Sequence, residues 1–300
     1  MASRYWVGGT DTWNGTAGTK WATTSGGTGG AAVPTSSDDV FIDNVNSIVT
    51  LGANATTRDL TISAGTFIAA TYDISCWRFI SIGTGTRTIH LGSGTLSHDF
   101  FSNGAAYVVH GSGLSFDAGT STITFPGAML SVQMVTDILT YYDLHIPGSA
   151  NEIILTTPNT QGGIENPGDG DGRLPAYGHD DAFETYLATN SIVFNEIQIA
   201  SNGVLIVQGG LPITVSSLVS LGTAATKAFL ASSLTGSQFY LLTTKAFIDV
   251  GDYLNVGSCR ASDNRFFIGA NSTDVGNNDG LVFGPPPTPG YDSGFLTFMQ

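Results

Sequence analysis

The side chains best suited to chemistry gather in one acidic stretch that is rich in glycine and proline, residues 159–190. Two carboxyl groups about 5 to 10 Å apart can hydrolyse a glycosidic bond, one as acid and the other as base or nucleophile. His179 beside Asp180 offers a further pair for proton transfer. Because no spacing singles out one pair, solvated surface acids are the stronger interpretation. The candidate carboxylates are Glu165, Asp169, Asp171, Asp180, Asp181 and Glu184, with Asp143 or Glu196 on neighbouring strands.

A calcium site is the second chemistry that this stretch could support. In "ENPGDGDG", Glu165, Asp169 and Asp171 are separated by small residues, and acids in a glycine-rich loop can bind Ca²⁺. The loop lacks the full spacing and the bidentate glutamate of an EF-hand. A mobile, self-repelling acidic loop is the alternative interpretation.

The remaining polar chemistry is dispersed along the chain. The five histidines share no short motif, and neither Cys76 nor Cys259 belongs to a cluster with metal-ligand spacing. Both cysteines stand among hydrophobic residues, so we expect buried free thiols, with a disulfide as the alternative. We expect no cofactor, and the acidic loop is the one metal candidate.

The charge balance argues against several classes of partner. The 300 residues include 24 Asp and Glu against 10 Lys and Arg, a formal net charge of -14. No basic stripe is present to neutralise nucleic-acid phosphates or anionic lipid. The start "MASRYWVGG" has no apolar run of signal-peptide length, and nowhere do eighteen apolar residues follow one another. We therefore expect no nucleic-acid partner, no membrane insertion and no classical export signal.

Short strands have to position these groups. Small and β-branched residues dominate and only 11% of residues are charged, which favours strands and turns over helices. Runs of four or five residues, mostly with period-two alternation, are joined by three to eight small residues, whereas antiparallel hairpins favour two-residue turns. This pattern predicts an all-β, degenerate parallel β-solenoid with N- and C-terminal caps and one long loop excursion. The expected strands are 47–51, 59–63, 66–70, 78–82, 87–91, 106–110, 113–116, 121–125, 143–146, 152–155, 190–194, 196–199, 203–207 and 212–215.

Two echoes within the chain support stacked units. "GTRTIHLGSGTL" (85–96) is nearly repeated as "GTSTITFPGAML" (119–130), and "RDLTIS" (58–63) is echoed by "YDLHIP" (142–147) and "NEIQIA" (195–200). We interpret each set as equivalent units of a stack, with glycine in the turn and aliphatic residues in the core. Arg87 and His90 then fall at outward positions and are candidates for contact with a partner.

The organisation that follows has five parts. Residues 1–46 form an N-terminal capping coil, 47–158 a β-solenoid, 159–190 the excursion, 191–283 the solenoid continuation with its closing segment, and 284–300 a proline-rich tail. The end of that tail is too apolar to remain in water, so we expect it to contact a neighbouring subunit or another protein. Its contact candidates are Phe295, Leu296, Phe298 and Met299.

Two terminal segments carry a resemblance to a known family. "RYWVGGTDTWNGTAGTKWATTSGGTGGAAVPTSSDDVFID" (4–43) resembles the opening coil of β-solenoid proteins of tailed bacteriophages and of some bacterial surface proteins. "FFIGANSTDVGNNDGLVF" (266–283) is similar to the segment that closes these solenoids, with Leu281 where a Trp is usual. The resemblance implies caps built from Trp6, Trp13 and Trp21 at one end and from Phe267, Leu281 and Phe283 at the other.

The resemblance also implies a function at the virion surface. We expect a non-enzymatic tail-fibre-like or tailspike-like host-adhesion protein, a homotrimer that contacts other virion proteins and a host surface glycan. Two alternatives stay open: a capsid decoration protein that stabilises the head, and a tailspike that degrades polysaccharide.

Overall fold

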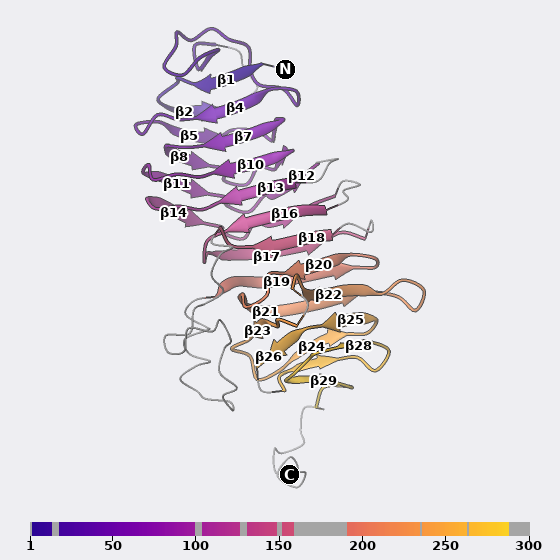
Figure 1. The fold of residues 1–300 in the computed structure, drawn as a ribbon. Helices are drawn as coiled ribbons and strands as arrows, with labels where there is room; N and C mark the ends of the chain where they lie inside the picture. The colour runs from indigo at the N-terminus through magenta and orange to yellow at the C-terminus, as the bar shows by residue number, and fades with distance from the viewer. Residues whose placement is uncertain are drawn as a thin grey trace.

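The computed structural model is an elongated stack of β-coils with the N-terminus at one end (Figure 1). The structure describes residues 2–13, 18–99, 104–126, 131–148, 152–158, 191–234, 236–262 and 264–287. Within these ranges the chain forms strands and turns and contains no helix. The predicted all-β solenoid is confirmed by large parallel sheets that run along the stack.

Four sheets line the stack. Sheet A contains β1 (Ser3–Trp6), β4 (Asp39–Ile42), β7 (Asp59–Ile62), β10 (Arg78–Ser81), β13 (Gly104–Val109), β16 (Ser131–Thr136), β18 (Glu152–Thr156), β20 (Val204–Val207), β22 (Ala228–Ser232), β25 (Leu254–Gly257) and β28 (Thr273–Gly276), with β3 (Trp21–Ala22) at its N-terminal end. Sheet B contains β2 (Thr10–Trp13), β5 (Ile48–Leu51), β8 (Gly65–Ile68), β11 (Arg87–His90) and β14 (Leu114–Asp117). Sheet C contains β6 (Ala55–Thr56), β9 (Ile74–Cys76), β12 (Thr95–His98), β15 (Thr122–Thr124), β17 (Thr140–Ile146), β19 (Ile192–Ala200), β21 (Pro212–Leu221), β23 (Phe239–Leu242) and β26 (Cys259–Ala261). Sheet D contains β24 (Ile248–Gly251), β27 (Phe266–Ile268) and β29 (Leu281–Phe283).

Residues in the left-handed region form the corner between sheets B and C in the first coils. Gly92 (φ 71°) and Gly119 (φ 58°) lie in this region, where a residue with a Cβ is strained. A Cβ on Gly92 would also lie 1.7 Å from the Ala70 carbonyl oxygen, and one on Gly119 would lie 2.2 Å from the Gly92 carbonyl oxygen. Ala70, Gly92 and Gly119 stack in successive coils. Their backbones can therefore approach closely, and the chain turns sharply at this corner.

The long strands β17, β19 and β21 turn their corner differently. In each, the set of inward positions shifts by one residue near the middle, and the shifts fall at Tyr142, Asn195 and Ser216. The ladder registers place these three residues opposite one another. Because inward and outward positions exchange there, each strand bends around the core. The segments 190–194 and 196–199, predicted as two strands, therefore belong to one bent strand, β19.

These bends change how a coil is closed. Before β16, each complete coil runs through sheets A, B and C, whereas from β22 onward the order is A, C and D. In the coils between them, a strand of sheet A alternates with one of the long sheet-C strands β17, β19 and β21. The second half of β21 lies against β24, where the Ser220 hydroxyl donates to the Asp252 carbonyl oxygen at 2.9 Å. Sheet B therefore ends at β14.

The register corrects one predicted equivalence and confirms part of another. Equivalent positions of the paired twelve-residue stretches do not stack: β11 lies in sheet B between β8 and β14, while β15 lies in sheet C between β12 and β17. The end of the first stretch instead pairs with the start of the second, with Leu96 opposite Ile123. The two stretches are alike because two different faces both need a turn glycine and inward aliphatic residues. In the second echo, 142–147 and 195–200 are true neighbours, with Asp143 opposite Glu196, but 58–63 contributes to sheet A.

The two ends of the stack differ. At the N-terminal end β3 runs antiparallel to β1, and the buried rings of Trp6 and Trp13 each contact Trp21 edge-on at 5.0 Å between centroids. At the other end β28 and β29 are the last described strands. All four β28 residues are exposed, and the Phe283 side chain is 38% exposed. Phe267 and Leu281 lie in sheet D, partly buried.

Candidate functional site

A recess with aromatic and polar side chains lies where sheet B ends. No described strand pairs with the free edge of β14, and the first residues of β17 lie beneath it, with the rings of Phe116 and Tyr141 in contact. A hollow of about 370 Å³ results. Its wall consists of residues 116–119 from the end of β14, 140–142 from β17, 193–195 from β19, and Ser216 from β21.

The bends supply the outward side chains of this hollow. Asn195 and Ser216 are exposed and Tyr142 is half-buried, because the shift in alternation turns these residues away from the core. The Asn195 side-chain nitrogen donates to the Asp143 carboxylate at 2.9 Å, which orients the amide. Successive coils thus place a phenol, an amide and a hydroxyl in one column.

Packed aromatic rings form the floor. Tyr141 is buried, stacks on Phe194 at 5.4 Å between ring centroids, and lies 5.1 Å from Phe116. Its hydroxyl is 2.5 Å from the Thr136 hydroxyl. Burial raises the pKa of Tyr141, so the ring stays a neutral, fixed wall at physiological pH.

Asp117 contributes the one carboxylate of the wall. Its side chain accepts a hydrogen bond from the Gly119 amide at 2.9 Å and lies 3.2 Å from Nδ1 of His90. The Gly119 amide and, second, His90 hold the pKa of Asp117 below its usual value. The group is therefore an ionised hydrogen-bond acceptor at neutral pH.

Two further acids stand side by side near the bend. Asp143 and Glu196 are partners in the β17–β19 ladder, both partly exposed. Asp143 accepts from Asn195, while Glu196 accepts from the Ser217 hydroxyl at 3.0 Å and lies 3.8 Å from Nε2 of His145. Of the carboxylates proposed for glycoside hydrolysis, this is the pair that the described residues bring together. The others, with His179, lie outside the described residues.

Arg87 is not an outward contact residue. Its side chain is 1% exposed because Arg87 and Ile89 share the inward face of β11. The guanidinium donates to the Ser81 hydroxyl at 2.7 Å and to several carbonyl oxygens at the corner between sheets A and B, including those of Gly85 at 3.0 Å and Ser112 at 3.1 Å. Burial lowers the pKa of Arg87. The predicted alternation is correct for Ile89 inward and His90 outward, but Arg87 has the same parity as Ile89 and its predicted outward position is wrong.

The cysteines are buried free thiols, as expected. Burial raises the pKa of both Cys76 and Cys259, so neither is a reactive thiolate. Cys76 Sγ lies 3.9 Å from Nδ1 of His98 in the core. In the described part of the chain, no group of three or more His, Cys, Asp or Glu residues could hold a metal ion.

Several predicted contacts cannot be placed. The calcium candidates Glu165, Asp169 and Asp171 lie outside the described residues, as do the tail residues Phe295, Leu296, Phe298 and Met299. Sequence reasoning missed Tyr142, Asn195 and Ser216. The available signal was the break in alternation between 190–194 and 196–199, which was interpreted as a gap between strands.

Comparison with known proteins adds no assignment. No protein-family model matches the chain, and no curated protein and no solved structure matches it. Among the described residues, no helix has the length and apolarity needed to cross a membrane.

Proposed function

We propose that the protein is a non-enzymatic structural component of a bacteriophage virion, a tail-fibre-like or tailspike-like host-adhesion protein at the virion surface. The observation that carries this proposal is the stack itself, in which parallel ladders join coil to coil along the described chain. Such a solenoid is stiff and holds side chains on flat faces, as an adhesin outside the cell requires.

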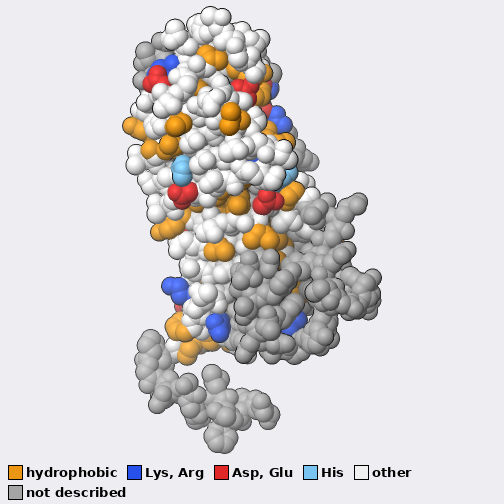
Figure 2. Space-filling model, turned by 90° about the vertical axis from the view of Figure 1, so that its left-hand side faces the viewer, with side chains coloured by type: hydrophobic (Ala, Val, Ile, Leu, Met, Phe, Trp, Pro, Cys, Tyr) orange, Lys and Arg blue, Asp and Glu red, His pale blue; other side chains and the backbone are white. Residues whose placement is uncertain are grey.

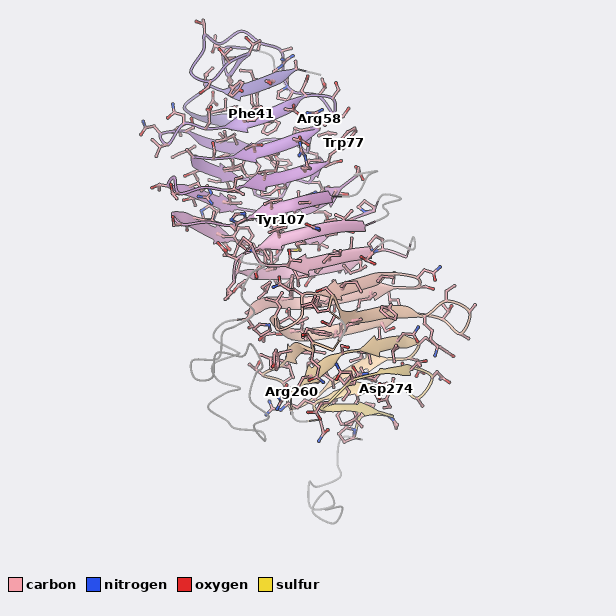
Figure 3. The ribbon with its side chains drawn as sticks, in the orientation of Figure 1. Phe41, Arg58, Trp77, Tyr107, Arg260 and Asp274 are labelled. Atoms are coloured by element: carbon pink, nitrogen blue, oxygen red, sulfur yellow. The ribbon has the colours of Figure 1, made fainter. Side chains whose placement is uncertain are left out.

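Side-chain ladders on sheet A reinforce the stack near its N-terminal end. Arg58 donates from Nε to Asp39 of the preceding strand at 2.6 Å, and Arg78 donates from Nε to Asp59 at 3.1 Å. Figure 3 shows Phe41, Arg58 and Trp77 at successive levels of this region. The Arg58–Asp39 and Arg78–Asp59 interactions each join two coils, so the acids in this region stabilise the contact between successive coils.

We also propose that the protein is not an enzyme. This part of the proposal concerns the candidate acid pair that the described residues bring together, Asp143 and Glu196. Asp143 is held by Asn195 and Glu196 by Ser217, so both carboxylates have neutral donors in place. A second candidate function, polysaccharide degradation, is favoured by one observation: the two acids are partners on adjacent strands. A capsid decoration protein is the alternative within the structural class, and self-association as a homotrimer remains part of the proposal.

Two measurements test these alternatives. Gold-labelled antibody on intact particles should mark the tail, whereas label spread over the head would replace the adhesin with the decoration protein. Incubation of the purified protein with host polysaccharide should release no oligosaccharide. Release that disappears in the Asp143→Asn and Glu196→Gln variants, but persists in a matched Asp279→Asn control, would establish the enzyme instead.

A further inference from the structure

We propose that the hollow beneath β14 is a binding site for a neutral oligosaccharide. The inference rests on the proposed adhesion function and specifies the site and the chemical class of its ligand. It is argued from the side chains of the wall and from the rigidity of the strands that carry them.

The polar groups of the wall match a ligand rich in hydroxyl groups. Thr140 and Ser216 present hydroxyls that can donate and accept, and Tyr142 adds a phenol. Asn195 uses its amide nitrogen on Asp143, and its carbonyl oxygen accepts no bond from the described residues. Asp117 adds an ionised acceptor for ligand hydroxyl groups. These groups are neutral with one exception, and they come from four successive coils.

The aromatic part of the wall suits the apolar face of a sugar ring. Phe116 and Tyr142 are both partly exposed, and they rise from a floor of buried Tyr141 and Phe194. Aromatic rings offer a flat contact with little conformational entropy to lose on binding. A pocket that combines aromatic surface with a few convergent polar groups is typical of small-ligand sites.

Charge around the hollow selects against anionic ligands. No Lys or Arg is among its lining residues, Asp117 belongs to the wall, and Asp143 and Glu196 stand beside the bend. Figure 2 shows a face on which charged side chains are sparse among hydrophobic patches. A sulfated, sialylated or uronate-rich chain would bring negative charge towards these carboxylates without a cation in the wall, so a neutral chain is favoured.

The site is rigid before it binds. The three bent strands are held in register on both sides of the bend, and Tyr141 is fixed by Phe194 and the Thr136 hydroxyl. Little ordering entropy therefore opposes binding.

The test is a printed array of neutral hexose and N-acetylhexosamine oligosaccharides together with sialylated, sulfated and uronate chains. The full-length protein should bind neutral chains. Ser216→Trp should fill the hollow and weaken binding at least about tenfold. Tyr142→Ala should weaken it similarly and Tyr142→Phe less, because the ring remains. The matched control Asn46→Ala changes an exposed turn in the N-terminal part of the stack and should bind as the wild type does.

The outcomes separate the site from the function. Neutral binding that survives Ser216→Trp and Tyr142→Ala, with unchanged thermal unfolding, would overturn the site while leaving adhesion in place. Preference for anionic chains would overturn the ligand class. Absence of binding to any chain, with gold label on the tail, would overturn this inference alone, whereas label on the head would overturn the proposed function.

Discussion

The first coils and the middle coils enclose the same kind of core but turn their corners by different means. Between sheets B and C of the first coils, Gly92 and Gly119 stack so closely that a Cβ would meet backbone atoms. In β17, β19 and β21 the strand continues through the corner, and Tyr142, Asn195 and Ser216 stand at the bend. A corner of two glycines and Ala70 leaves little side chain for contact with a ligand, whereas a bent strand presents one outward side chain from every coil.

This difference locates the region available for function. The glycine column is committed to close backbone packing, so its composition is constrained by geometry. The bend needs only a shift in alternation, so its outward residues are free to differ without loss of the core. The hollow occurs where the two arrangements meet, because sheet B ends there.

The largest expected effect comes from breaking the corner between sheets A and B in the first coils. Arg87→Ala should lower the free energy of unfolding by about 3–5 kcal/mol, because several buried acceptors at this corner lose their donor. Urea unfolding followed by circular dichroism measures the change. Lys245→Ala is the control, because Lys245 is exposed and its replacement should cost about 0.5 kcal/mol or less. Equal losses would contradict the structural role given to Arg87.

Acid should weaken the first coils through His98. Its ring is fully buried, stacked on Phe125 at 4.9 Å between centroids, and burial lowers its pKa from 6.5 to about 4. The unfolded chain therefore takes up a proton first, so stability falls as pH drops from about 6.5 to about 4 and no further below. The loss should reach about 3 kcal/mol.

The measurement is the free energy of unfolding at a series of pH values for the wild type and for His98→Phe. Other acid-sensitive groups, such as Asp117, contribute equally to both proteins and cancel in the difference. The difference between the two should grow between pH 6.5 and pH 4. A pH-independent difference would show that the His98 ring is not held neutral in the fold.

The glycine corner itself can be tested with one methyl group. Gly92→Ala should cost about 2–3 kcal/mol, because a left-handed φ is combined with a clash against the Ala70 carbonyl oxygen. Gly210→Ala is the control, since Gly210 has φ 81° but an added Cβ has no neighbour within 4 Å. Thermal unfolding should rank the two, and a larger loss at Gly210 would refute the close-packed corner.

The bend should be the most tolerant position. Asn195→Ala removes one exposed hydrogen bond to Asp143 and should change the free energy of unfolding by about 1 kcal/mol or less. Chemical unfolding checks this value. A loss as large as that of Gly92→Ala would mean that the bend depends on its side chains as much as the corner depends on its glycines.

Particular elements show how far sequence reasoning reached. The period-two runs identified β5, β7 and β20 closely, because each has alternating inward aliphatic residues. Strands with weaker patterns were missed, including β9 and β16, and Arg87 was assigned to the outward face although its side chain lies inward. A cation at a core position contradicts composition rules, and only the carbonyl oxygens of the folded corner make it favourable. Asp143 and Glu196 were candidate carboxylates in the sequence. That they lie opposite each other follows from the register between β17 and β19, which the sequence alone did not show.

The sequence by itself determined the class of fold, since short alternating runs joined by small residues can bury their apolar sides only by stacking. It also determined an acidic overall charge, because 24 Asp and Glu outnumber 10 Lys and Arg. Only the tertiary structure decided which coil lies on which. The similar strands β11 and β15 belong to different sheets. The break in alternation between 190–194 and 196–199 is a bend within β19 and not a gap between two strands. Register is set by contacts between residues far apart in the chain, and a shift of one residue exchanges the inward and outward faces.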